Sequence, residues 1–131
     1  MEPIIEKQIT HDKLLEKGYK PLTKEELSSL IIGNTVYGDY EYSGHRVFSS
    51  YMAEDGSIEG ENDWGSHESG HWSIDEAGVL SVEWNGYWEA WSGIAFQVEH
   101  EIKFYDLENG KWRTTFHKIL KGEHELKING V

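Results

Sequence analysis

Cysteine is absent from this sequence of 131 residues, so no disulfide can stabilise the fold and no thiolate can act as a nucleophile or metal ligand. No apolar run is long enough to span a bilayer, and residues 1–20 carry charges where a signal peptide would have its apolar core. There is also no phosphate-cradling glycine loop and no dinucleotide fingerprint, so no cofactor is expected. These absences predict a cytoplasmic protein, unless a leader was removed.

Basic residues are scarce: 12 Lys and Arg stand against 24 Asp and Glu, which gives a net charge of −12. Such a charge repels phosphate backbones and anionic lipid surfaces, because binding to either depends on clustered Lys and Arg. We therefore expect no nucleic-acid partner and no membrane partner. An acidic surface favours solubility, or alternatively an inhibitor or immunity-type protein that binds a basic partner. A homodimer is compatible with the sequence.

The length fits one domain, which we divide into a helical lead-in (1–33), a β-barrel (34–126) and a tail (127–131). Residues 11–18 are typical of a short helix that ends at Gly18. Thr23 stands three residues before Glu26 and is followed by Leu27, which indicates a capping box and a second short helix. The lead-in is therefore one or two short helices.

From Thr35 onward the apolar pattern changes to a period near two, with turn signals at short intervals. Glycine marks the predicted hairpin corners, as at Asp55-Gly56 and Asn85-Gly86, and no proline after Pro21 interrupts strand pairing. So many short strands without intervening helices favour a closed antiparallel meander over a flat sheet with exposed edges. The predicted strands are 35–41, 45–54, 57–62, 70–75, 79–84, 92–100, 101–106, 111–118 and 119–126.

Alternation along these strands predicts one apolar face that forms the core and one polar face in water. The predicted core residues are Trp72, Ile74, Leu80, Val82, Trp84, Ile94, Phe96, Val98, Ile102, Phe104, Trp112 and Phe116. The fold class is thus mainly β, a small barrel preceded by short helices.

A spaced series of residues carries a resemblance to a known family. The series is Leu22-Thr23-x-x-Glu26-Leu27, Gly33-x-Thr35, Asp55-Gly56 and Gly70-x-Trp72-x-x-Asp75-x-x-Gly78-x-Leu80-x-Val82-x-Trp84. It resembles the small bacterial lipocalin-like (calycin-like) proteins of an uncharacterised family, over roughly residues 21–106. The resemblance implies a barrel that binds a small molecule at its mouth, or, as in a minority of such barrels, isomerisation or cyclisation there. It transfers no catalytic residue.

The segment His67-Glu68-Ser69-Gly70-His71 matches the H-E-x-x-H zinc motif. That motif requires a helix, which puts both histidines on one face, whereas Gly70 and the following strand pattern indicate a loop entering a strand. A zinc protease is therefore not predicted. A non-helical metal site at His67 and His71 stays as an alternative and would need a third ligand such as His45, His100 or His117.

An aromatic cluster surrounds the corner at Asn85-Gly86. Its members, Trp84, Tyr87, Trp88 and Trp91, cannot all follow the inward alternation, so at least one should lie at the rim or fold over an opening. Aromatic rings at a barrel mouth offer flat apolar walls to a ligand, or else they fill the barrel end as core.

Four further residues complete the candidate site: Arg46, Tyr51, His71 and Glu83. A His or Glu in an apolar wall could move a proton, and Arg46 could bind a ligand carboxylate. The simpler interpretation leaves His71 and Glu83 on the solvent face. The sequence thus predicts a small-molecule-binding barrel, with a cofactor-independent isomerase, cyclase or lyase as one alternative and an acidic inhibitor as the other.

Overall fold

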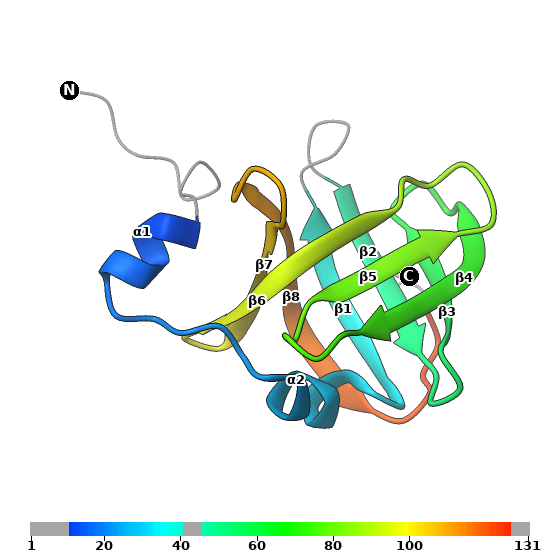
Figure 1. Ribbon diagram of the computed structural model, residues 1–131. Helices are drawn as coiled ribbons and strands as arrows, with labels where there is room; N and C mark the ends of the chain where they lie inside the picture. Colours follow the sequence, from blue (N-terminus) through cyan, green and yellow to red (C-terminus); the bar gives the residue numbers. More distant parts are fainter. Residues whose placement is uncertain (1–10, 41–45, 127–131) are drawn as a thin grey trace.

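The computed structural model describes residues 11–40 and 46–126, with Arg46 described by its backbone alone. Within these residues it contains two short helices and eight strands that pair in sequence order, and β1 also pairs with β8 to close a barrel (Figure 1). All pairs are antiparallel, so the predicted fold class is confirmed. The elements are α1 (His11–Glu16), α2 (Lys24–Ile31), β1 (Asn34–Tyr40), β2 (Arg46–Met52), β3 (Ser57–Asn62), β4 (His67–Ile74), β5 (Leu80–Trp84), β6 (Trp91–Val98), β7 (Glu101–Asp106) and β8 (Trp112–Lys121).

Helix α2 begins at the predicted capping box and covers one end of the barrel (Figure 1). The Thr23 hydroxyl accepts a hydrogen bond of 3.1 Å from the Glu26 N–H, and the Glu26 carboxylate accepts one of 2.9 Å from the Thr23 N–H. Leu27 and Ile31, on the buried face of the helix, pack into the core cluster that fills this end of the barrel. Apolar side chains therefore close the barrel at the end that α2 covers. A site can then lie only at the opposite end.

The predicted hairpin corners are present, and two boundaries differ from the prediction. Gly56 takes a positive φ at its predicted corner, and Gly78 and Gly110 do so in the turns before β5 and β8. The predicted strands 111–118 and 119–126 form one continuous strand, β8, because no turn residue stands between them. This strand ends at Lys121, so the predicted strand over 122–126 is wrong. Strand β4 begins at His67 rather than near Gly70, so the predicted loop over 67–69 is wrong.

The two faces of strand β6 are reversed relative to the prediction. Gly93 and Ala95 face the interior, and a Cβ at Gly93 would lie 3.0 Å from the Cβ of Phe104 and 3.3 Å from the ring of Trp91. Phe96 lies on the outer face in a second cluster with Leu14 of α1 and Tyr105 of β7, and Ile94 and Val98 pack against this cluster. Helix α1 of the lead-in packs on this outer patch through Leu14. The patch is apolar because it is buried there.

Trp112 also faces outward, although it was predicted as core together with Phe116. The pairing of β7 with β8 changes register at a bulge: Phe104 pairs with Thr114, while Tyr105 pairs with Trp112. The extra residue, Arg113, reverses the alternation there. Phe116 lies in the core as predicted, and Trp112 packs against the outer cluster.

Candidate functional site

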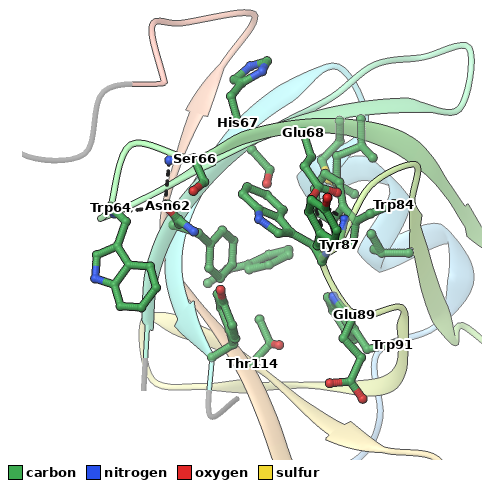
Figure 2. Close-up of a pocket in the computed structure, with 18 residues that line it drawn as sticks. Asn62, Trp64, Ser66, His67, Glu68, Trp84, Tyr87, Glu89, Trp91 and Thr114 are labelled. Carbon is green, nitrogen blue, oxygen red and sulfur yellow. Dashed lines mark hydrogen bonds between the residues drawn. The ribbon is translucent and has the colours of Figure 1, made fainter. Parts of the chain in front are cut away.

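A cavity of about 560 Å³ lies inside the barrel at the end opposite α2 (Figure 2). Met52, Ile58 and Val82 form part of its apolar wall, and Trp64 and Tyr87 stand exposed at the rim. Among the described residues its aromatic walls are formed by Tyr40, Phe48, Trp84, Trp88, Trp91 and Phe116. The cavity is thus mainly apolar, and its rim at one end is exposed to solvent.

Glu68 points into the mouth of this cavity, because β4 is a regular strand through the H-E-x-x-H segment. Residues alternate between faces in a strand, so His67 and His71 face outward and Glu68, paired with Gly60, faces inward. His67 lies at the rim, 3.5 Å from the carboxylate of Glu59 on the outer face. Residues 67–71 therefore lack the helix that an H-E-x-x-H zinc site requires. Across the described part of the chain, no group of three or more His, Asp or Glu side chains is arranged to hold a metal ion.

The Glu68 carboxylate holds the loop between β5 and β6. It accepts backbone N–H bonds from Gly86 (3.1 Å), Tyr87 (2.7 Å) and Trp88 (3.1 Å). A carboxylate that accepts several N–H bonds at once fixes the backbone that donates them. Gly86 allows this approach, since a Cβ there would lie 2.6 Å from a Glu68 oxygen. Glu68 therefore positions the loop that carries the aromatic cluster.

The predicted aromatic cluster is brought together at the mouth. Trp84 and Trp88 meet edge to face with ring centroids 4.7 Å apart, and Trp91 meets Phe104 in the same manner at 5.4 Å. Tyr87 is fully exposed at the rim. Gly60 lies behind the first pair: a Cβ there would be 2.9 Å from both indole rings, so the missing side chain lets the rings lie against β3.

Besides the tyrosines, four uncharged polar side chains line the cavity among the described residues: Ser50, Asn62, Ser66 and Thr114. Asn62 is buried, and its Oδ1 accepts N–H bonds from Trp64 (2.9 Å) and Ser66 (3.0 Å), which fixes the turn between β3 and β4. The Thr114 hydroxyl is buried without a hydrogen-bond partner among the described residues. These groups can form specific hydrogen bonds with a ligand.

The other predicted site residues do not line the cavity. His71 and Glu83 pair with each other across β4 and β5 and are exposed on the outer face. Tyr51 alternates with the inward-facing Ser50 and Met52, so it faces outward as well. The side chain of Arg46 and all of His45 lie outside the described residues. The ligand-binding role of these residues stays a prediction.

The sequence did not point to Asn62, Ser50 or Thr114 as cavity residues. Alternation from Ile58 through Gly60 gives a signal for Asn62, because every second residue of β3 faces inward. Thr114 has a similar signal, because it lies two residues before the inward-facing Phe116 on β8.

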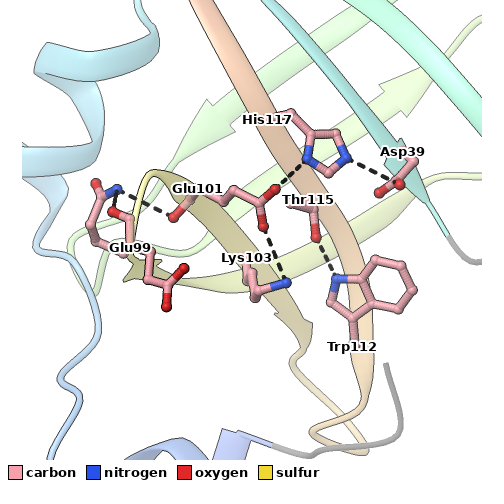
Figure 3. A network of polar contacts seen from close by, with 8 residues as sticks. Asp39, Glu99, Glu101, Lys103, Trp112, Thr115 and His117 are labelled. Carbon is pink, nitrogen blue, oxygen red and sulfur yellow. Dashed lines mark hydrogen bonds and ion pairs between the residues drawn. The ribbon is translucent and has the colours of Figure 1, made fainter. Parts of the chain in front are cut away.

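A polar network lies on the outer face of β1, β7 and β8 (Figure 3). The His117 ring contacts Glu101 at 2.6 Å through Nδ1 and Asp39 at 3.1 Å through Nε2. Burial lowers the pKa of His117, but hydrogen bonds and attraction from the two carboxylates outweigh it and the pKa is raised. Burial raises the pKa of Glu101, but the bond to His117 contributes to a net lowering. His117 thus joins β8 to β1 and β7, and Lys103 adds a contact of 3.4 Å to Glu101 within β7.

The fold and the cavity define a closed antiparallel barrel with an aromatic mouth, consistent with a lipocalin-like fold. No protein-family model, curated protein or solved structure matches the chain. Among the described residues, no helix has the length and apolar character needed to cross a membrane.

Proposed function

We propose that this protein binds a small molecule in the barrel cavity, through the aromatic mouth formed by the β5–β6 loop. The observation that carries the proposal is a preformed cavity of about 560 Å³ walled by indole and phenyl rings. Pockets for small molecules are typically apolar and of roughly 300–1,000 Å³, with a few placed polar groups. The resemblance to lipocalin-like, calycin-like bacterial proteins supports the same function, since such barrels generally bind small molecules in the barrel mouth.

Binding is favoured over proton transfer by where the titratable groups stand. The titratable groups described along the cavity are, besides the tyrosines, Glu68, Glu89 and His67. Glu68 already accepts three backbone N–H bonds, and Glu89 and His67 are exposed at the rim. An isomerase or cyclase needs an available base beside its substrate, within hydrogen-bond reach. The polar groups further along the wall are hydroxyls and an amide, which bind and orient a ligand.

The proposal is tested with 1-N-phenylnaphthylamine, an uncharged dye whose fluorescence rises in apolar surroundings. We expect saturable binding by the wild-type protein and a loss of at least tenfold in affinity for Ser50→Leu, which fills the cavity from β2. Ser73→Leu is the matched control, because Ser73 lies exposed on the outer face of β4. Equal binding by both variants, or no saturable binding by the wild-type protein, would contradict the proposal.

A further inference from the structure

The polar groups of the cavity wall indicate which ligand it takes. Given the binding function proposed above, we infer that the ligand is an uncharged planar molecule with a carbonyl-type acceptor that receives a hydrogen bond from the amide nitrogen of Asn62. The aromatic walls would bind the planar part of such a ligand, and the hydroxyls of Ser50 and Thr114 would lie along its polar edge.

The orientation of the Asn62 amide is fixed by the turn beside it. Its Oδ1 accepts the N–H groups of Trp64 and Ser66, so Nδ2 must be the remaining end of the amide. Figure 2 shows this nitrogen on the cavity side, and it has no hydrogen-bond partner among the described residues. An amide N–H₂ can only donate, so the complementary group of the ligand is an acceptor.

Thr114 supplies a second and independent observation. Its side chain lines the cavity on β8 and is 1% exposed, yet its hydroxyl has no partner in the described part of the chain. A buried hydroxyl without a partner is costly, and natural proteins keep few of them. Rotation about χ1 carries its hydroxyl to another of the three staggered positions, so a ligand atom in the cavity can satisfy it. Ser50, also in the wall, offers another adaptable hydroxyl.

The charges around the cavity favour an uncharged ligand. Glu68 is satisfied by three backbone N–H bonds, and Glu89 lies 3.9 Å from Arg113 at the rim. No Lys or Arg is found among the described side chains that line the cavity. A carboxylate ligand would therefore enter a protein of net charge −12 in which Arg113, the described cation nearest the rim, is already paired with Asp106 and Glu89. A cation would find no carboxylate among the described residues of the deeper wall, since Glu68 and Glu89 lie at the mouth.

Four probes of one planar shape test this inference by isothermal titration calorimetry: 2-naphthamide, 2-naphthoate, 2-naphthamidinium and naphthalene. They share the ring and differ in charge and in hydrogen-bonding groups. We expect 2-naphthamide to bind at least tenfold tighter than 2-naphthoate and 2-naphthamidinium, and severalfold tighter than naphthalene, because only the amide offers an uncharged acceptor to Asn62. Equal affinities for the four probes would overturn the inference and leave the binding function standing. No binding of any probe would overturn both.

Asn62→Asp gives the sharper test. Aspartate keeps an oxygen for the Trp64 and Ser66 N–H bonds and presents a second oxygen to the cavity, where the amide nitrogen was. The preference should then move from 2-naphthamide to 2-naphthamidinium by at least tenfold. Asn109→Asp is the matched control, since Asn109 accepts a similar turn bond from Lys111 and lies outside the cavity. An unchanged ranking in folded Asn62→Asp would overturn the inference.

A second variant keeps the test valid if Asn62→Asp does not fold. Thr114→Val replaces a hydroxyl without a partner by a methyl group of the same shape, so folding should be preserved. We expect its affinity for 2-naphthamide to fall severalfold while its affinity for naphthalene stays the same. An equal change for both probes would remove Thr114 from the polar edge and overturn the assignment.

Discussion

The backbone N–H of Tyr87 donates a hydrogen bond of 2.7 Å to the carboxylate of Glu68, which joins β4 to the loop after β5. Gly86 and Trp88 donate to the same carboxylate, so one side chain fixes three consecutive residues of the loop. Since the loop places Trp88 against Trp84, the shape of the cavity mouth depends on Glu68.

Replacing Glu68 by Ala should therefore loosen the mouth. We expect a loss of about 1–2 kcal/mol in the free energy of unfolding, since the freed N–H groups can bind water at this exposed loop. The near-ultraviolet circular dichroism of the Trp84–Trp88 pair should weaken, and affinity for 1-N-phenylnaphthylamine should fall severalfold. Glu83→Ala is the control, because Glu83 is exposed on the outer face of β5. An unchanged dichroism spectrum in Glu68→Ala would contradict this role.

Two glycines that face different neighbours should respond differently to alanine. At Gly60 a Cβ would meet the ends of two indole rings at 2.9 Å, which can shift, so Gly60→Ala should cost about 1–3 kcal/mol and reduce dye affinity. At Gly70 a Cβ would lie 2.0 Å from the carbonyl oxygen of Glu83, which is backbone of the paired strand. Gly70→Ala should therefore cost about 3 kcal/mol or more. Urea unfolding curves measure both, and a larger cost at Gly60 would contradict the comparison.

Much of the fold was predictable because local signals agree with the final structure. The capping box at Thr23 predicts α2, and the alternation of Leu80, Val82 and Trp84 predicts the inner face of β5. The inward face of strand β6 could not be predicted from alternation. Its apolar residue Phe96 is buried on the outer face, by a lead-in whose docking depends on contacts distant in the sequence.

The candidate site was predictable only in part for the same reason. The aromatic loop is visible in the sequence because four large rings surround one turn. The bonds that hold it come from Glu68, about twenty residues earlier, and a local period carries no information about such a contact. The outward position of Trp112 depends on a bulge, which shifts the alternation by one residue. The face on which His71 and Glu83 lie also depends on strand register, because a shift of one residue would turn both side chains into the barrel.

The lead-in should stabilise the barrel without shaping the cavity. Leu14 of α1 is buried against Phe96 and Tyr105 on the outer face, so Leu14→Ala should cost about 2–3 kcal/mol. Leu15, its neighbour in the same helix, is 46% exposed, and Leu15→Ala should change stability little. Thermal unfolding compares the two variants. Dye affinity should be the same in both at a temperature where they are folded, and a selective loss in Leu14→Ala would link α1 to the cavity.

The His117 network should make stability depend on pH within a defined window. The pKa of His117 is raised in the folded protein, so its contribution is fully present below the unfolded value of 6.5 and is lost as pH rises through the folded value. The pKa of Glu101 is lowered, so its contribution is present above 4.5 and is lost as pH falls through the folded value. Both contributions are therefore complete between these two pH values.

The loss of stability in His117→Asn should accordingly be largest between pH 4.5 and 6.5 and should shrink above it. Because the ring is 43% exposed, solvent screening keeps the pairing contribution to about 1 kcal/mol or less. Urea unfolding at a series of pH values gives the difference from wild type, and the ring proton shifts of His117 report its titration directly. His100→Asn, at an exposed turn, is the control and should show no such window. A difference that grows between pH 6.5 and 9 would contradict the sign, because the imidazolium form would then not be the one that the carboxylates stabilise.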